Sequence, residues 1–259
     1  MKKLFLLTIL TAFAMHTMAQ QVKYSVKGTY ADNGKKIYLV DKLTDRNIDS
    51  AVVVKGKFSF KGKAEKNAFM GIEAANKKWT TIFFNDGKPI VVNVNDSTLK
   101  GSLLNERLTK YDLEGEAPNK KFSEKVSTMT QEEIMAHEKE LMDELNNVMD
   151  GQIAHANKIF KEESHTLIPL AFAELYFYDN GLEAYDDLVK EQVVFANHPY
   201  LKKARDEIAK AMQQEDNEKT AFVGQPFTDL EMADPNGKMH KLSETVGEGK
   251  WVLVDFWAS

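Results

Sequence analysis

QVKYSVKG, residues 21–28, decides the fold of the first part of the chain, because its apolar side chains alternate with polar ones. This period of two is the pattern of a β-strand with one buried face. Short apolar runs continue to about Lys100, and turn residues such as Asp32-Asn33-Gly34 and Lys55-Gly56-Lys57 separate them. We therefore expect a β-rich domain over residues 20–110, built as a small antiparallel sandwich or barrel.

After Gly101 the apolar period changes to 3.6, which predicts a helical region over residues 111–218. Thr130 and Glu133 form a capping-box pattern at the start of one long amphipathic helix that runs to Phe160, with Gly151 as the point where it could bend or split. The pattern predicts further helices over residues 167–178 (ending at Asn180-Gly181), 182–195 and 199–214, and a polar linker over residues 213–220.

Three methionines, Met135, Met142 and Met149, repeat at heptad spacing in the long helix. Side chains at this spacing share one helix face, so they belong either to the core or to a seam against a partner helix. The second interpretation allows a homo-oligomer that forms through the helical region.

The N-terminus has the pattern of a secretory signal peptide over residues 1–19. A cationic Met1-Lys2-Lys3 precedes an apolar run over residues 4–14, and the small residues Thr17 and Ala19 predict cleavage after Ala19. The alternative is a membrane anchor, but the run falls short of the roughly 20 apolar residues that span a bilayer. We expect a mature protein in the periplasm of a Gram-negative cell.

Composition excludes several function classes. The net charge is −5 and there is no basic block, so no nucleic acid partner is expected. The chain has no cysteine, and therefore no disulfide and no thiol. His137-Glu138 begins like a zinc motif, but Leu141 stands where the second histidine is required. No metal site and no cofactor are predicted.

The apolar pattern changes again over residues 219–259. Asp234-Pro235-Asn236-Gly237 predicts a turn, since proline fixes φ early in it and glycine accepts a positive φ at its end. The run from Trp251 to Trp257 is almost wholly apolar, which is typical of a strand buried on both faces in an α/β sheet. The predicted fold class is therefore α+β multidomain, with an incomplete α/β segment at the C-terminus.

A family resemblance rests on the motifs VGQPF (223–227), DPNGK (234–238), KLS (241–243) and GKWVLVDFWAS (249–259). Together they resemble the opening of a thioredoxin-like domain in periplasmic thiol–disulfide oxidoreductases of the TlpA and ResA type, within the AhpC/TSA-related superfamily. The β-rich part resembles an uncharacterised β-domain that commonly precedes such domains, through Gly28, Ile37-Tyr38-Leu39, Asp49-Ser50-Ala51 and Gly56-Lys57-Phe58-Ser59-Phe60. The resemblance implies a Trp-Cys-x-x-Cys motif immediately after Ser259.

The resemblance also implies roles for two residues. Asp255 matches the buried aspartate that assists proton transfer to the resolving cysteine, and Trp257 matches an aromatic residue beside the active site. The partners implied for the family are protein thiols or disulfides and a membrane electron donor. No catalytic cysteine is present in the chain, so the expected function is that of an oxidoreductase fragment that is inactive as given.

Two other functions stay open. One is a non-enzymatic periplasmic binding or assembly module, in which the β-domain and the helices contact a partner. The other is a peroxiredoxin-like antioxidant protein, which needs a cysteine within Pro-x-x-x-Thr-x-x-Cys, whereas Phe256-Trp257-Ala258-Ser259 matches the approach to a Cys-x-x-Cys.

Overall fold

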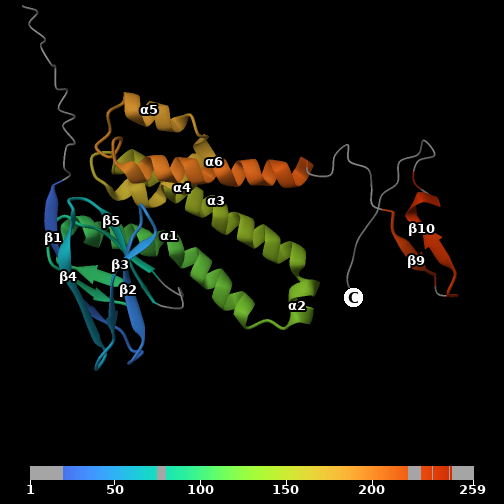
Figure 1. Ribbon diagram of the computed structural model, residues 1–259, viewed down its shortest axis with the longest axis horizontal. Helices are drawn as coiled ribbons and strands as arrows, with labels where there is room; N and C mark the ends of the chain where they lie inside the picture. The colour runs from blue at the N-terminus through green and yellow to red at the C-terminus, as the bar shows by residue number, and fades with distance from the viewer. Residues whose placement is uncertain (1–19, 75–79, 221–228, 235, 245, 247–259) are drawn as a thin grey trace, which may run out of the picture. The chain divides into compact units, whose positions relative to one another are not determined.

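The computed structural model describes residues 20–74, 80–220, 229–234, 236–244 and 246 (Figure 1). The predicted signal peptide and the predicted strand from Trp251 to Trp257 lie outside these residues. The chain divides into two compact units, Met1–Ala209 and Lys210–Ser259, and each is described separately. The described residues contain no helix long and apolar enough to cross a membrane.

The first unit begins with eight β-strands in two sheets. One sheet has the order β4-β1-β7-β8, and the other has the order β3-β2-β5-β6. The strands are β1 (Gln21–Thr29), β2 (Lys36–Asp41), β3 (Arg46–Val52), β4 (Lys57–Glu65), β5 (Phe69–Ala74), β6 (Thr80–Phe84), β7 (Ile90–Asn93) and β8 (Thr98–Lys100).

The two sheets enclose a shared apolar core, so the domain is a sandwich and not a barrel. Val26 and Phe60 come from one sheet, Leu39 and Ile72 come from the other, and all four are almost fully buried in a single cluster. The alternation in the sequence therefore correctly predicts which side chains point inward. The strand pairs are antiparallel except for β1 and β7, which are parallel. The wholly antiparallel prediction is wrong for this pair, because the chain passes through the second sheet before it returns beside β1.

Two glycines in the β1–β4 pair lie under aromatic rings. Gly28 is opposite Phe58, and Gly62 is opposite Tyr24. A Cβ atom at residue 28 would lie 2.0 Å from the Phe58 ring, and one at residue 62 would lie 2.3 Å from the Tyr24 hydroxyl. Only glycine lets each ring lie flat over the neighbouring backbone, a pairing that stabilises strand glycines by covering them.

Helix α1 (Leu103–Ser127) follows the sandwich directly, so helical structure begins within the range expected to be β-rich. Ser102 caps it by accepting a hydrogen bond from the Asn105 N–H. The buried Asn105 amide also pairs with the backbone of Phe84, accepting from its N–H at 2.7 Å and donating to its carbonyl at 2.9 Å. These bonds attach the first turn of α1 to the end of β6.

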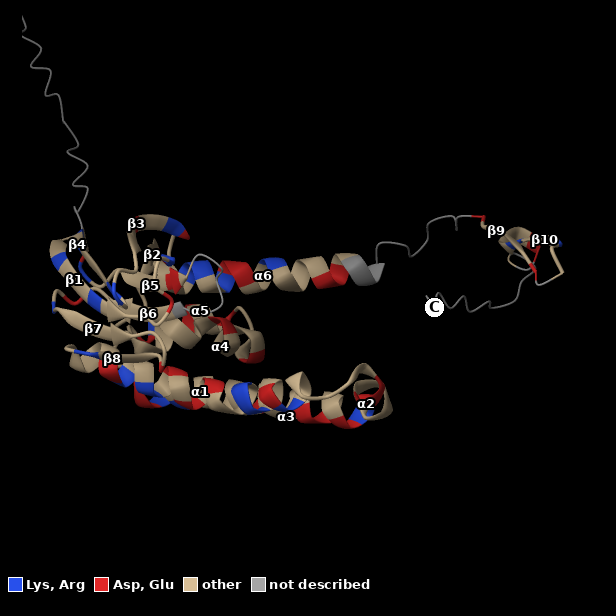
Figure 2. Ribbon diagram, turned by 90° about the horizontal axis from the view of Figure 1, so that it is seen from below, with Lys and Arg blue, Asp and Glu red and all other residues tan. Residues whose placement is uncertain are grey.

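The predicted long helix is two helices, α2 (Gln131–Ala136) and α3 (Glu138–Glu162). The capping box of Thr130 and Glu133 is confirmed. The break falls at His137, where the backbone leaves helical geometry and the N–H donates to the carbonyls of Glu133 and Ile134. Gly151 lies inside the unbroken α3, where the turns on either side hold its helical backbone. α1 and α3 run side by side away from the sandwich, and α2 lies at their far end (Figures 1 and 2).

The remaining helices are η1 (Ile168–Phe172), α4 (Ala173–Asn180), α5 (Ala184–Lys190) and α6 (Pro199–Thr220). Gly181 ends α4 with a positive φ, as its position after Asn180 predicts. α5 is shorter than the helix predicted to reach Phe195. The predicted linker is wrong, because α6 continues through those polar residues to Thr220. Polar residues such as Glu, Gln and Lys are good helix formers, so polarity alone does not end a helix.

The second unit contains a short hairpin of β9 (Glu231–Ala233) and β10 (Met239–Lys241), followed by η2 (Leu242–Glu244). The predicted turn is present: the Asp234 carbonyl accepts from the Gly237 N–H at 2.9 Å, and Gly237 has φ +82°. The Asp234 carboxylate also accepts from the Asn236 and Lys238 N–H groups, and these bonds lower its pKa.

Candidate functional site

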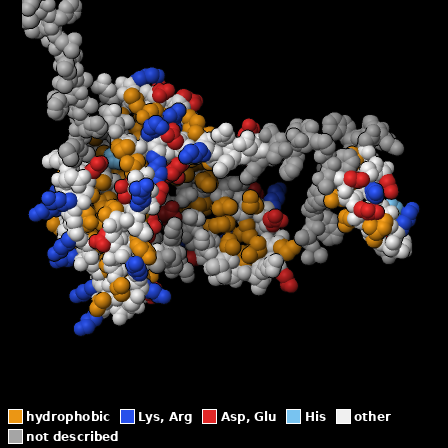
Figure 3. Space-filling view, in the orientation of Figure 1, with side chains coloured by type: hydrophobic (Ala, Val, Ile, Leu, Met, Phe, Trp, Pro, Cys, Tyr) orange, Lys and Arg blue, Asp and Glu red, His pale blue; other side chains and the backbone are white. Residues whose placement is uncertain are grey.

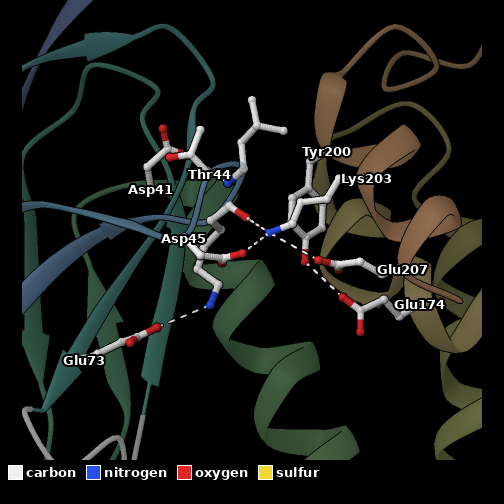
Figure 4. A network of polar contacts seen from close by, with 10 residues as sticks. Asp41, Thr44, Asp45, Glu73, Glu174, Tyr200, Lys203 and Glu207 are labelled. Atoms are coloured by element: carbon white, nitrogen blue, oxygen red, sulfur yellow. Dashed lines mark hydrogen bonds and ion pairs between the residues drawn. The ribbon is translucent and has the colours of Figure 1, made fainter. Parts of the chain in front are cut away.

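A network of polar contacts lies at the junction between the sandwich and α6 (Figure 4). Lys203, on the second turn of α6, donates to the Lys42 carbonyl at 2.7 Å and to the Asp45 carboxylate at 2.5 Å. Its ammonium also lies 3.5 Å from Glu207. One lysine therefore joins the β2–β3 turn to α6, and its side chain is only 18% exposed.

Two carboxylates and a tyrosine continue this network on the helical side. The Tyr200 hydroxyl donates to Glu174 at 3.3 Å. Burial raises the pKa of Glu174, and the nearby Glu207 raises it further. Burial likewise raises the pKa of Tyr200, so its phenol keeps its proton. The Tyr200 ring packs edge-on against Phe69 of β5, with ring centroids 4.7 Å apart. The arrangement therefore holds α4, α6 and the sandwich together.

His198 precedes α6 and satisfies two backbone groups. Its Nδ1 accepts from the Tyr200 N–H at 3.2 Å, so its Nε2 carries the proton that is donated to the Asn67 carbonyl at 3.1 Å. Burial lowers the pKa of His198, which favours this neutral form. His198 is thus a helix cap whose ring also fixes the β4–β5 turn, where Asn67 has φ +67°.

A cleft of 570 Å³ lies beside this junction. Its walls come from the β4–β5 turn, the β2–β3 turn and the loop before α6, with residues including Asn67, Leu43, Ile48, Val194 and His198. Ile48 and Val194 are exposed, at 40% and 63%. A concave surface with apolar side chains and a few polar groups is suited to holding a ligand or a peptide segment.

A second polar cluster lies between α1 and the C-terminal end of α3. The Glu163 side chain is 2% exposed and accepts from Arg107, from the Tyr111 hydroxyl at 3.0 Å and from the Thr166 hydroxyl at 3.2 Å. A buried carboxylate with three donors is satisfied, which assigns it a structural role. Nearby on α1, burial and the neighbouring Glu116 raise the pKa of Asp112 to about 6.

The described residues contain no group of histidine, cysteine and carboxylate side chains that could hold a metal ion. His137 lies at the α2–α3 break and pairs with Glu140 at 3.3 Å. Asp255 and Trp257, the residues matched to the family, lie outside the described residues. Of the acids and bases described above, Lys203, Glu174 and Glu163 join elements of the fold.

His198, Lys203 and Asn67 are site residues that were not predicted from the sequence. His198-Pro199 carries a usable signal, since a side chain that can cap a helix precedes a proline suited to the first turn. Lys203 carries none, because its partners lie on a turn about 160 residues earlier in the chain.

The structure contradicts one of the two predicted roles of the methionines, that of core residues. Met135, Met142 and Met149 are 71%, 52% and 44% exposed. They are therefore not core residues of this chain, and the partner seam stays a prediction.

Comparison with known proteins matches part of the chain to one family. A family model described as a domain of unknown function (DUF4369) matches residues 24–140. The match runs from β1 through the sandwich, α1 and α2 to the first residues of α3. No curated protein matches the chain.

Proposed function

We propose that this chain is part of a periplasmic thiol–disulfide oxidoreductase of the TlpA and ResA type, in which residues 20–209 are a binding and positioning body. The observation that carries the proposal is the sequence GKWVLVDFWAS at residues 249–259 with its lead-in DPNGK at residues 234–238. The hairpin turn at Asp234–Gly237 is consistent with an ordered lead-in to such a domain.

The chemistry of this family requires two thiols. One thiolate attacks a disulfide of the substrate, and the second thiol resolves the mixed disulfide that results. The 259 residues contain neither thiol, so this chain by itself is expected to be inactive in disulfide exchange. In the proposed assignment Asp255 would serve the resolving cysteine and Trp257 would flank the site, once a Cys-x-x-Cys follows Ser259.

Reading the coding region after the codon for Ser259 tests this proposal. We expect codons for Trp-Cys-x-x-Cys to follow directly. Their absence in every frame would refute the assignment, and a single cysteine in a Pro-x-x-x-Thr-x-x-Cys pattern would favour a peroxiredoxin-like protein.

A non-enzymatic binding or assembly module is the second candidate function. The cleft at the junction and the exposed methionines on α2 and α3 favour it, since both are surfaces on a body without thiols. The two candidates differ in one measurable respect: only the first predicts catalysed reduction of a protein disulfide when the following cysteine pair is present.

A further inference from the structure

Within the part of the chain that the structure describes, the methionine stripe is an apolar face without a partner, in the far half of the α1–α3 hairpin. We define it as Met142, Leu145 and Met149 on α3, with Met135 on α2. Spacing of three and four residues places the α3 side chains on one helix face. Leu145 is 38% exposed, and the methionines are more exposed. Figure 3 shows hydrophobic side chains gathered over this part of the hairpin.

The stripe continues a face that is buried elsewhere in α3. Ala156 and Phe160 lie about two and three turns beyond Met149 on the same face. Both are buried, and Phe160 stacks on Tyr176 of α4 with ring centroids 3.8 Å apart. The end of α4 is marked by Asn180, which donates to Asn157 of α3 at 2.7 Å. On the N-terminal side of Asn157, α4 no longer covers α3, and the stripe from Met142 to Met149 occupies about two turns of this uncovered part.

The charges around the stripe have one dominant sign. Residues 131–150 contain one lysine, Lys139, and seven carboxylates: Glu132, Glu133, Glu138, Glu140, Asp143, Glu144 and Asp150. Glu144 is paired with Lys125 of α1, and the other six exceed the cations of this segment. Glu138 lies one turn before Met142 on the same face, and Asp143 and Asp150 directly follow Met142 and Met149. Figure 2 shows the acidic residues along α2 and α3.

This charge excess argues against a second copy as the occupant. Two copies meeting through the stripe would bring their acidic flanks together, and opposed like charges weaken an interface. A partner with an apolar face and flanking lysine or arginine residues complements both features. Methionine side chains are flexible and polarizable, so they adapt to differently shaped apolar partners.

We propose that the methionine stripe is a docking site for a cationic amphipathic helix of a partner protein. The partner's apolar residues, at helical spacing, would pack on Met142, Leu145 and Met149, while its cationic residues face Glu138, Asp143 and Asp150. Amphipathic helices bind partner proteins through their apolar face, with anchors at helical spacing. The inference goes beyond the proposed redox function and holds whether or not a cysteine pair follows Ser259.

Fluorescence anisotropy with labelled synthetic peptides tests the proposal on the full chain. The probe is a Leu/Lys amphipathic helical peptide, and two matched peptides serve as controls: Leu/Glu with the same apolar pattern, and Gln/Lys with the same charge. We expect saturable one-to-one binding of Leu/Lys alone, weakened by added salt. Equal binding of Gln/Lys would overturn the apolar part of the proposal, and equal binding of Leu/Glu would overturn the charge part.

Variants then locate the site. Met142→Gln with Met149→Gln should weaken binding of the Leu/Lys peptide at least about tenfold, as loss of central apolar contacts does. Val52→Gln with Val91→Gln is the matched control, since both valines are exposed apolar residues on the sandwich. Equal affinity of the methionine variant and the wild-type chain would refute the site. A dimer of the free chain that the methionine substitutions dissociate would refute it in favour of a second copy.

Discussion

Replacing Gly28 by alanine should destabilise the sandwich through one specific ring. The added Cβ atom would lie 2.0 Å from Cζ of Phe58, and two further ring atoms lie within 2.5 Å of it. The Phe58 ring is buried, so it cannot move without disturbing the core between the sheets. Overpacking of this kind costs roughly 1–3 kcal/mol, and we expect G28A to lose that much free energy of unfolding.

A double-mutant cycle isolates the cause. Phe58→Ala by itself should cost about 3–5 kcal/mol, because it leaves a cavity in the core. In that background the alanine at residue 28 has no ring to meet, so its additional cost should fall close to zero. The coupling energy between the two positions should therefore be about 1–3 kcal/mol.

Gly151 provides the control, because the same glycine-to-alanine substitution there should change the free energy of unfolding in the opposite direction. No atom lies within 4 Å of a Cβ atom built at Gly151, which sits in the middle of α3. Gly151→Ala should stabilise the protein by about 0.5–1 kcal/mol, the usual preference for alanine in a helix. Urea denaturation followed by far-UV circular dichroism measures all four variants. A G28A protein as stable as the wild type would contradict the predicted clash, and so would a cost that is the same with and without the Phe58 ring.

Three further predictions concern Asp112, Lys203 and the N-terminus. Burial raises the pKa of Asp112 to about 6, so the folded chain loses stability as pH rises from about 4 to 6. D112N should therefore be more stable than the wild type by at most about 3 kcal/mol above pH 6, and equally stable below pH 4. The free energy of unfolding measured against pH checks this. Lys203→Met should cost about 1–2 kcal/mol in urea unfolding, since the Lys42 carbonyl and Asp45 lose their donor; Lys190→Met, an exposed i,i+3 pair, is the control and should change little. Mass spectrometry of the protein recovered from a periplasmic fraction should find Gln20 as the first residue, and a chain that retains Met1 would contradict the predicted cleavage.

The sequence predicts the sandwich well because strand burial is a local property. Alternation at Val22, Tyr24 and Val26 depends only on neighbouring residues, and the structure keeps it. Strand direction is not local: the parallel pairing of β1 with β7 joins Val26 to Ile90, and no pattern within either strand encodes it. The contact between Lys203 and Asp45 is not local either, because it joins α6 to the β2–β3 turn and forms only when these elements pack together.

Helix boundaries were predicted where capping chemistry marks them. Thr130 and Glu133 form the predicted box, and Gly181 ends α4 as expected. The break at His137 carries no such signal, and Gly151 misleads because a glycine weakens a helix without necessarily ending it. Part of the candidate site follows the same rule: His198 could have been found as a cap, whereas the partner of its Nε2, the Asn67 carbonyl, could not.

The rate of insulin disulfide reduction by dithiothreitol, with and without added protein, tests the central claim most directly. The 259-residue chain should leave the uncatalysed rate unchanged, because it has no thiol. The chain extended through the codons that follow Ser259 should accelerate the reaction, and replacing the first cysteine of the added pair by serine should abolish the acceleration. An extended chain that carries the pair but gives only the uncatalysed rate would contradict the assignment to the thiol–disulfide oxidoreductases.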